Sequence, residues 1–233
     1  EMTGEELLED KEAVQWMFVR SKREGYRIDM LRPGVWKLQD YTGSSFYVVE
    51  GTRAALVIDT GFGPELVTPW IRKITSLPLE LALTHCHGDH MYHADEFKTV
   101  YLSAKEKEPL ERMKKTMLAG RDIDYDSLQD IPDGTVIDLG GLGIEVMELP
   151  GHTPGNAMFW AKKQGIMFTG DHILFDISPN ITSWLESEDS LGDYLDSLRL
   201  ARKYPVRLAL PGHRKTGDYA ARIEALLAHH ERR

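Results

Sequence analysis

Short apolar runs, separated by glycines and charged residues, recur along the chain from residue 35 onward. Such runs are typical of strands buried on one or both faces, and a glycine between two of them indicates a turn. Gly51 lies in such a place, and the Gly140–Gly143 run predicts a second hairpin turn. The runs predict strands at Val35–Leu38, Phe46–Glu50, Ala54–Asp59, Leu79–Leu83, Thr135–Leu139, Ile144–Leu149, Ala157–Ala161, Ile166–Thr169 and Val206–Leu210.

Other stretches carry apolar residues at helical spacing among charges. They predict helices at 5–24, 64–76, Ala104–Leu118, Leu191–Lys203 and about 218–230. Ser190 is the expected N-cap of the helix at 191–203, and Asp193 would complete its capping box. Strands and helices in this order are typical of an α/β domain in which helices cover sheets. We expect one domain over 1–233, with an N-terminal helical extension over 1–30.

Composition and charge exclude several classes of protein. The 233-residue chain has a formal net charge of −9, which disfavours nucleic-acid binding because that affinity draws on clustered Lys and Arg. No apolar run approaches the roughly 20 residues that span a bilayer, so we expect no membrane partner. The acidic start lacks the basic and apolar regions of a signal peptide, which predicts a cytoplasmic protein.

The sharpest polar feature is the segment THCHGDH at 84–90, directly after a predicted buried strand. In an extended chain side chains alternate, so His85, His87 and Asp89 are expected to point to one side. His90 then turns back as the chain enters a helix. Imidazole nitrogen and carboxylate oxygen are ligands for zinc and similar ions, so the segment predicts a metal site.

Three later segments each place a ligand-type residue beside glycine after a predicted strand. They are LPGHTPG at 149–155, FTGDH at 168–172 and LPGH at 210–213, and they carry His152, Asp171 and His213. Glycine lets the backbone turn sharply and approach a metal centre closely. Each segment alone is an ordinary turn pattern, but together with the first motif they predict one site assembled from distant parts of the chain.

The motifs HxHxDH, GHTPG, TGD and PGH, in this order, resemble those of the metallo-β-lactamase superfamily. Asp59, in VIDTG at 57–61, matches the first motif of that family, whose aspartate supports the ligand loop. The resemblance extends from about Val35 to His213. It implies a four-layer αββα sandwich of the α/β class, with metals at one edge of the two facing sheets.

By position, the resemblance implies a centre of two divalent metal ions, zinc before iron or manganese. Cys86 lies between two of the implied ligands, His85 and His87, and does not occupy a ligand position. We therefore expect its side chain to have a packing role only. The first ion would be held by His85, His87 and His152, and the second by Asp89, His90 and His213, with Asp171 bridging both.

Such a centre implies hydrolysis of a small-molecule substrate. Two metal ions about 3.5–4 Å apart can share a hydroxide, because metal binding lowers the pKa of water to about 7. Asp89 is the residue that we expect to orient this nucleophile and to move its proton. We expect a small thioester, ester or lactone as substrate, as for glyoxalase-II-type enzymes, which this chain resembles.

Other chemistries occur on the same scaffold, and fold alone does not select among them. A phosphodiesterase or nuclease, a β-lactam hydrolase and an iron-dependent dioxygenase are the alternatives, the nuclease being disfavoured by the acidic balance. We expect the segments 40–46 and 175–188 to line a substrate pocket beside the metal site. The sequence leaves open the oligomeric state and whether the substrate contacts Tyr41, His93, His172 or Trp184.

Overall fold

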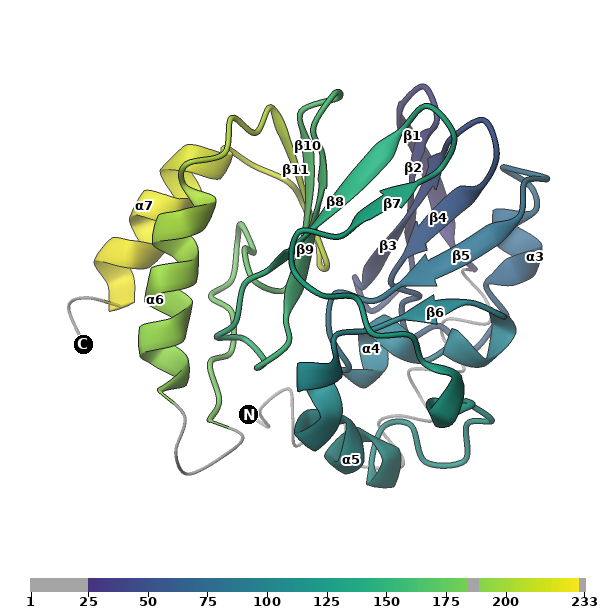
Figure 1. Cartoon of the computed structure of the whole chain (residues 1–233), viewed down its shortest axis with the longest axis horizontal. Helices are drawn as coiled ribbons and strands as arrows, with labels where there is room; N and C mark the ends of the chain where they lie inside the picture. The colour runs from purple at the N-terminus through teal and green to yellow at the C-terminus, as the bar shows by residue number, and fades with distance from the viewer. Residues whose placement is uncertain (1–24, 184–188, 231–233) are drawn as a thin grey trace.

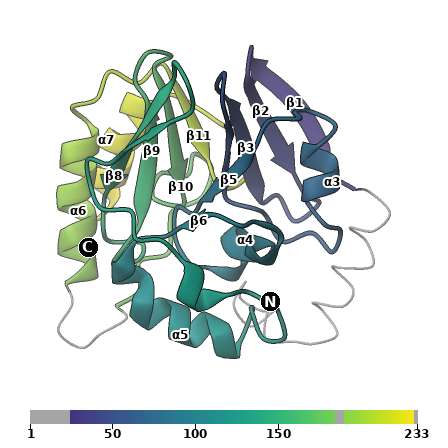
Figure 2. The same ribbon diagram turned by 45° about the vertical axis from the view of Figure 1, so that its right-hand side comes forward.

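The computed structural model describes residues 25–183 and 189–230. Two β-sheets face one another, and helices lie on the outer face of each (Figures 1 and 2). The helix predicted at 5–24, and with it most of the expected N-terminal extension, lies outside the described residues.

The first sheet is formed from the N-terminal half of the chain and has the order β1-β2-β3-β4-β5-β6. The second has the order β11-β10-β9-β8-β7. The β4–β5, β5–β6 and β10–β11 pairs are parallel. The strands are β1 Arg27–Arg32, β2 Val35–Gln39, β3 Ser45–Glu50, β4 Ala55–Ile58, β5 Leu79–Ala82, β6 Val100–Tyr101, β7 Val136–Asp138, β8 Gly143–Glu148, β9 Ala157–Ala161, β10 Ile166–Gly170 and β11 Leu208–Pro211.

The central strands are buried on both faces, which explains their continuous apolar runs. In β4, Leu56 and Ile58 pack into the core between the sheets. Ala55 and Val57 belong to the outer core of the first sheet. Side chains alternate across a strand, so one four-residue element serves two cores.

The helices complete four layers. Those on the first sheet are α3 Thr68–Ile71, α4 Gly88–Met91 and α5 Lys107–Lys115, and those on the second are α6 Ser190–Ala201 and α7 Tyr219–His230. Tyr194 and Leu198 of α6 join Ile223 and Leu226 of α7 in the outer core of the second sheet. The predicted αββα arrangement is confirmed.

The helix predicted at 64–76 is wrong in extent, because only Thr68–Ile71 is α-helical. The carboxylate of Glu96 accepts hydrogen bonds from the backbone N–H groups of Val67 and Thr68 at 3.0 and 2.9 Å. This contact starts the helix well after Pro64. The segment then continues in tighter turns, such as that closed by Ile74 N–H and Ile71 C=O.

The expected N-cap of α6 is also wrong. Asp189 caps this helix, and its side chain accepts from the N–H of Gly192 at 3.0 Å. Ser190 is instead the first residue of the helix and is buried. Two strands were not predicted, β1 because its polar residues mask the alternation of an edge strand, and β6 because it has two residues.

Backbone hydrogen bonds join the two sheets at one edge. The N–H of Ser45 donates to Gly212 C=O at 2.7 Å, and the N–H of Ala157 donates to Thr84 C=O at 2.8 Å. The loops that follow β5, β8, β10 and β11 lie at this edge. Within 25–183 and 189–230, no helix has the length and apolar character needed to cross a membrane.

Candidate metal centre

All the predicted metal ligands lie at the edge where the two sheets are joined. Each segment that carries them begins at the end of a strand, so the sheets set the positions of these segments. His85 and His87 lie in the loop after β5, Asp89 and His90 on α4, His152 after β8, Asp171 after β10 and His213 after β11.

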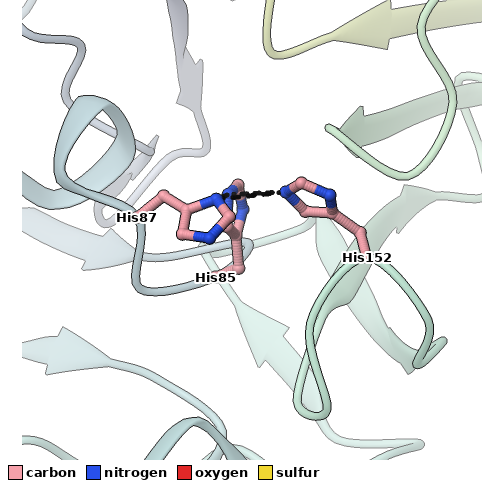
Figure 3. Close-up of side chains that lie close together, drawn as sticks. All are labelled: His85, His87 and His152. Atoms are coloured by element: carbon pink, nitrogen blue, oxygen red, sulfur yellow. Dashed lines mark hydrogen bonds between the residues drawn. The ribbon is translucent and has the colours of Figure 1, made fainter. Parts of the chain in front are cut away.

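Three imidazoles form a first cluster, and their rings point toward one another (Figure 3). His85 Nε2 lies 2.9 Å from His87 Nδ1, and His152 Nε2 lies 3.2 Å from each of these atoms. Zinc–nitrogen bonds of about 2.05 Å in tetrahedral geometry would separate two ligand nitrogens by roughly 3.3 Å. The spacing of the three nitrogens fits one such ion.

In His85 and His152, Nδ1 faces the surrounding protein and Nε2 faces the other imidazoles. The partner of each Nδ1 shows whether the Nε2 of the same ring carries a lone pair. His152 Nδ1 lies 2.7 Å from the carbonyl oxygen of Asn180, which only accepts, so this nitrogen is the donor. The Thr84 hydroxyl donates to the Asp59 carboxylate and therefore accepts from His85 Nδ1 at 3.0 Å. The Nε2 atoms of His85 and His152 thus face one another as lone pairs, which is the arrangement that a cation stabilises.

A second cluster combines imidazoles with carboxylates. His213 Nε2 lies 3.1 Å from Asp89 Oδ2 and 3.2 Å from Asp171 Oδ2. His90 Nε2 lies 3.8 Å from Asp89 Oδ2 and 3.5 Å from Asp171 Oδ1. His90 Nε2 and Asp171 Oδ1 are buried and have no hydrogen-bond partner, although such atoms nearly always have one. Two orphaned ligand atoms side by side fit the binding of a cation.

Asp171 connects the two clusters. One of its oxygens, Oδ2, faces His213 of the second cluster and lies 3.9 Å from His152 Nε2 of the first. The rings of His85 and His90, one from each cluster, have centroids only 4.0 Å apart. The residues present therefore fit two adjacent cations with a shared carboxylate.

Two imidazoles of the first cluster, those of His85 and His87, have lowered pKa values in the protein alone. Burial lowers the pKa of His85 well below its usual range, and the neighbouring imidazoles of His90, His87 and His152 add to this effect. Burial, followed by the proximity of His152, lowers the pKa of His87 to about 3. These rings offer lone pairs at physiological pH without having to lose a proton first.

In the second cluster, carboxylates raise the pKa values of the imidazoles instead. Burial opposes charge on His213, but Asp171 and Asp89 outweigh it and raise the pKa of His213 to about 10. The pKa of His90 is raised in the same way, with Asp59 contributing. Burial would raise the pKa of Asp89 and of Asp171, but His90 and His213 hold both below the usual range. A cation entering this cluster would replace protons.

Asp59 forms hydrogen bonds with both ends of the THCHGDH segment at 84–90, as the family resemblance implied. Its carboxylate accepts from Thr84 N–H at 2.8 Å and from His90 Nδ1 at 2.9 Å. The backbone of Asp59 has φ +63°, a left-handed conformation that ends β4 and turns the side chain under the ligand loop. A carboxylate that accepts a hydrogen bond from a ligand-type imidazole orients the ring and increases its basicity.

The expectation that His85, His87 and Asp89 point to one side is wrong for Asp89. His85 and His87 do converge, but α4 begins at Gly88. Extended alternation stops there, and helical spacing carries Asp89 to the second cluster beside His90 and His213.

Sequence reasoning missed the supporting roles of Thr84 and Asp40. Buried Asp40 accepts from the N–H groups of Thr42 and Ser44 and, through its other oxygen, from that of Phe62. It thereby folds the 40–44 loop that places Ser44 Oγ 3.5 Å from His213 Nδ1. Its position directly after a strand was the available signal.

Glycine at 170 is required by close approach as well as by its positive φ of 49°. A Cβ there would lie 2.7 Å from both Cβ and Oγ1 of Thr84, the residue that hydrogen-bonds Asp59 and His85. The glycine beside Asp171 therefore permits β10 to pack directly against the ligand loop of the other sheet.

The remaining candidates have separate surroundings. His93 is buried, with Nε2 donating to Gly63 C=O at 2.7 Å and Nδ1 3.0 Å from Glu96 Oε1. His172 is buried against the Tyr194 ring, and neither of its nitrogens has a hydrogen-bond partner. Tyr41 is half-buried, Cys86 is fully buried in the outer core of the first sheet, and Trp184 lies outside the described residues.

Curated proteins of two kinds are similar to this chain in sequence. It is 30% identical over 196 residues to an atrochrysone carboxyl ACP thioesterase of Aspergillus terreus, covering 82% of this chain and 56% of that protein. It is 26% identical over 188 residues to a beta-lactamase-like protein 2 homolog of Caenorhabditis elegans, covering 78% and 58%. The chain therefore spans less than two thirds of the length of these relatives.

A solved structure shares the fold of this chain, and a family model gives the assignment. A metallo-beta-lactamase family protein from Thermus thermophilus has the same fold, with a TM-score of 0.71 at 24% identity over 87% of this chain and 81% of the other. Residues 40–213 match the model of the metallo-beta-lactamase superfamily, a range that includes every predicted ligand. This chain belongs to the metallo-β-lactamase superfamily.

Proposed function

We propose that this chain is a dinuclear metal-dependent hydrolase that acts on a small thioester, ester or lactone. The observation that carries the proposal is the pair of adjacent ligand clusters joined by Asp171. A pair of divalent ions held by these residues would lower the pKa of a shared water to about 7 and would so supply hydroxide near neutrality.

The donors suit zinc, with iron or manganese as alternatives, because imidazole nitrogen predominates and carboxylate oxygen completes the set. His85, His87 and His152 would hold one ion, and Asp89, His90 and His213 the other, with Asp171 in contact with both. The carboxylates of Asp89 and Asp171 also offset the positive charge of such a centre.

Asp89 is the residue that we assign to handling the proton. Its side chain is 25% exposed, more than those of His213 and Asp171 at 17% and 12%, so substrate and water reach the site on its side. Its Oδ2 makes the contacts with His213 and His90, which leaves Oδ1 to hold the attacking water and to accept its proton. The pKa of Asp89 lies below its usual range because His90 and His213 outweigh burial, so this carboxylate is ionised and able to accept.

Two loops that contact ligands are the proposed walls for the substrate. The 40–44 loop reaches His213 through Ser44, and the segment 175–183 reaches His152 through the carbonyl of Asn180. A carbonyl substrate between them would lie over the exposed side of Asp89. The thioesterase name of the Aspergillus relative supports a carbonyl substrate over a phosphodiester.

A panel of chromogenic substrates tests the proposal. The protein is stripped with a chelator, reloaded with zinc, manganese or iron, and assayed with a thioester, a lactone, a cephalosporin and a phosphodiester. We expect metal-dependent turnover of the thioester or the lactone. Turnover of the phosphodiester alone would contradict the substrate class, and one iron per chain with oxygen uptake would contradict hydrolysis.

Two variants assign the activity to this centre. Asp89→Asn keeps the shape of the side chain but removes its capacity as a base, and we expect kcat to fall by about 100-fold or more. The matched histidine comparison is His152→Gln against His229→Gln, the latter on α7 and outside both clusters. Full activity in Asp89→Asn and in His152→Gln, as in the control His229→Gln, would exclude this site.

A further inference from the structure

We propose that Glu106 is a positioning residue that fixes the distance between the two loops holding the first cluster. The proposal rests on the proposed function in that it concerns metal binding at His85, His87 and His152. Glu106 lies at the end of the 3₁₀ turn Ala104–Glu106, immediately before α5, and its side chain is fully buried.

Each oxygen of the Glu106 carboxylate contacts a different ligand loop. Oε2 accepts from the backbone N–H of Cys86 at 2.9 Å, and Cys86 stands between His85 and His87. Oε1 accepts from the backbone N–H of Gly155 at 2.8 Å, in the loop that carries His152. One loop leaves β5 of the first sheet and the other leaves β8 of the second, so a single side chain joins ligand segments from both sheets.

A carboxylate is the group that this position requires. Both N–H groups are donors, and a charged acceptor makes stronger hydrogen bonds with them than a neutral one does. Glutamine has the same shape but only one accepting oxygen, and its NH₂ group would face the second N–H. The glutamine variant would therefore release one of the two loops.

Packing makes this connection rigid. A Cβ at residue 155 would lie 2.8 Å from Ser103 Oγ and 2.9 Å from the backbone nitrogen of Glu106. The loop of His152 therefore rests directly on the turn that carries Glu106. Since the lone pairs of His85 and His152 repel one another when no cation is present, a contact that holds their backbones together prepares the site before metal enters.

The first test is metal affinity in Glu106→Gln, with Glu96→Gln as the matched control. Glu96 also accepts two backbone N–H groups, but at the start of α3, and it belongs to neither cluster. Zinc is titrated in competition with a chromophoric chelator, and cobalt absorption reports the geometry of the sites. We expect Glu106→Gln to weaken one site about 10- to 100-fold and to change the cobalt spectrum, while Glu96→Gln leaves both unchanged. Unchanged affinity in Glu106→Gln would overturn the proposal.

The second test uses the unmodified protein and does not depend on the variant folding. Amide hydrogen exchange is measured after the metal is stripped with a chelator. We expect the N–H groups of Cys86 and Gly155 to remain protected without metal, and rapid exchange at both would overturn the proposal. If the unmodified protein binds no metal at all, the proposed function fails, whereas protection of these two amides would still report the contact with Glu106.

Discussion

The Nε2 atoms of His85 and His152 lie 3.2 Å apart, and the Nδ1 atom of each ring donates to an acceptor in the surrounding protein. Two lone pairs thus face one another in a buried place, where electrostatic repulsion is strong. A cation between them converts this repulsion into attraction, so the folded state should be coupled to metal binding.

We therefore expect removal of metal to lower the melting temperature and to make it depend on metal concentration. A ligand that binds only the native state at 1,000 times its Kd adds about 4 kcal/mol of stability. Calorimetry of chelated protein, with zinc added back in steps, measures the effect. A melting temperature indifferent to both treatments would show that no such coupling exists.

Substitution of Asp59 by Asn should weaken metal binding without unfolding the protein. Asparagine tolerates the left-handed backbone at this position, where φ is +63°, so the change isolates the loss of the carboxylate. Because the carboxylate orients His90 and Thr84, we expect a loss in affinity of about 10- to 100-fold. Competition with a chelator measures it. Substitution of the exposed Asp138 by Asn is the control. Equal metal affinities in the two variants would show that Asp59 does not contribute to metal binding.

Alanine at Gly170 should destabilise the protein more than alanine at Gly134. Both glycines have positive φ, so each variant carries about 1 kcal/mol of backbone strain. At Gly134 nothing lies within 4 Å of the added Cβ, whereas at Gly170 the Cβ meets Thr84 at 2.7 Å. Overpacking there adds about 1–3 kcal/mol. Urea denaturation measures the free energy of unfolding of both variants. Equal losses would mean that Thr84 moves aside for the added Cβ at no energetic cost.

The metal-free protein should lose stability as the pH rises. The pKa of His213 is raised from 6.5 to about 10, because Asp171 and Asp89 outweigh the opposing effect of burial. A raised pKa means that its stabilisation is fully present below pH 6.5 and is lost as the pH rises through about 10. We expect chelated protein to show a falling melting temperature over this range, with a smaller fall in His213→Gln. Parallel curves for the two proteins would refute the assignment.

The sequence was sufficient to predict the four layers and to nominate every residue of the two clusters. The predicted ligands were visible because His152, Asp171 and His213 each stand beside glycine soon after a buried strand. His85 also follows such a strand and is two residues from a second histidine. The end of a strand fixes the position of the loop residues next to it, so motifs far apart in sequence could be placed at one edge.

Features that depend on contacts between distant loops could not be predicted. Glu106 has no local pattern, since its role exists only because the fold brings Cys86 and Gly155 to either side of it. The short α3 has the same kind of cause, because the carboxylate that starts it comes from Glu96. Local propensity favoured a longer helix, and a tertiary contact determined where it begins.

Anomalous X-ray scattering from crystals grown with zinc tests the central claim most directly, because it locates each ion without reference to activity. We predict two peaks about 3.5–4 Å apart, with His85, His87 and His152 around one, Asp89, His90 and His213 around the other, and Asp171 touching both. A single peak, or two peaks whose neighbours are other side chains, would contradict a dinuclear centre at this site.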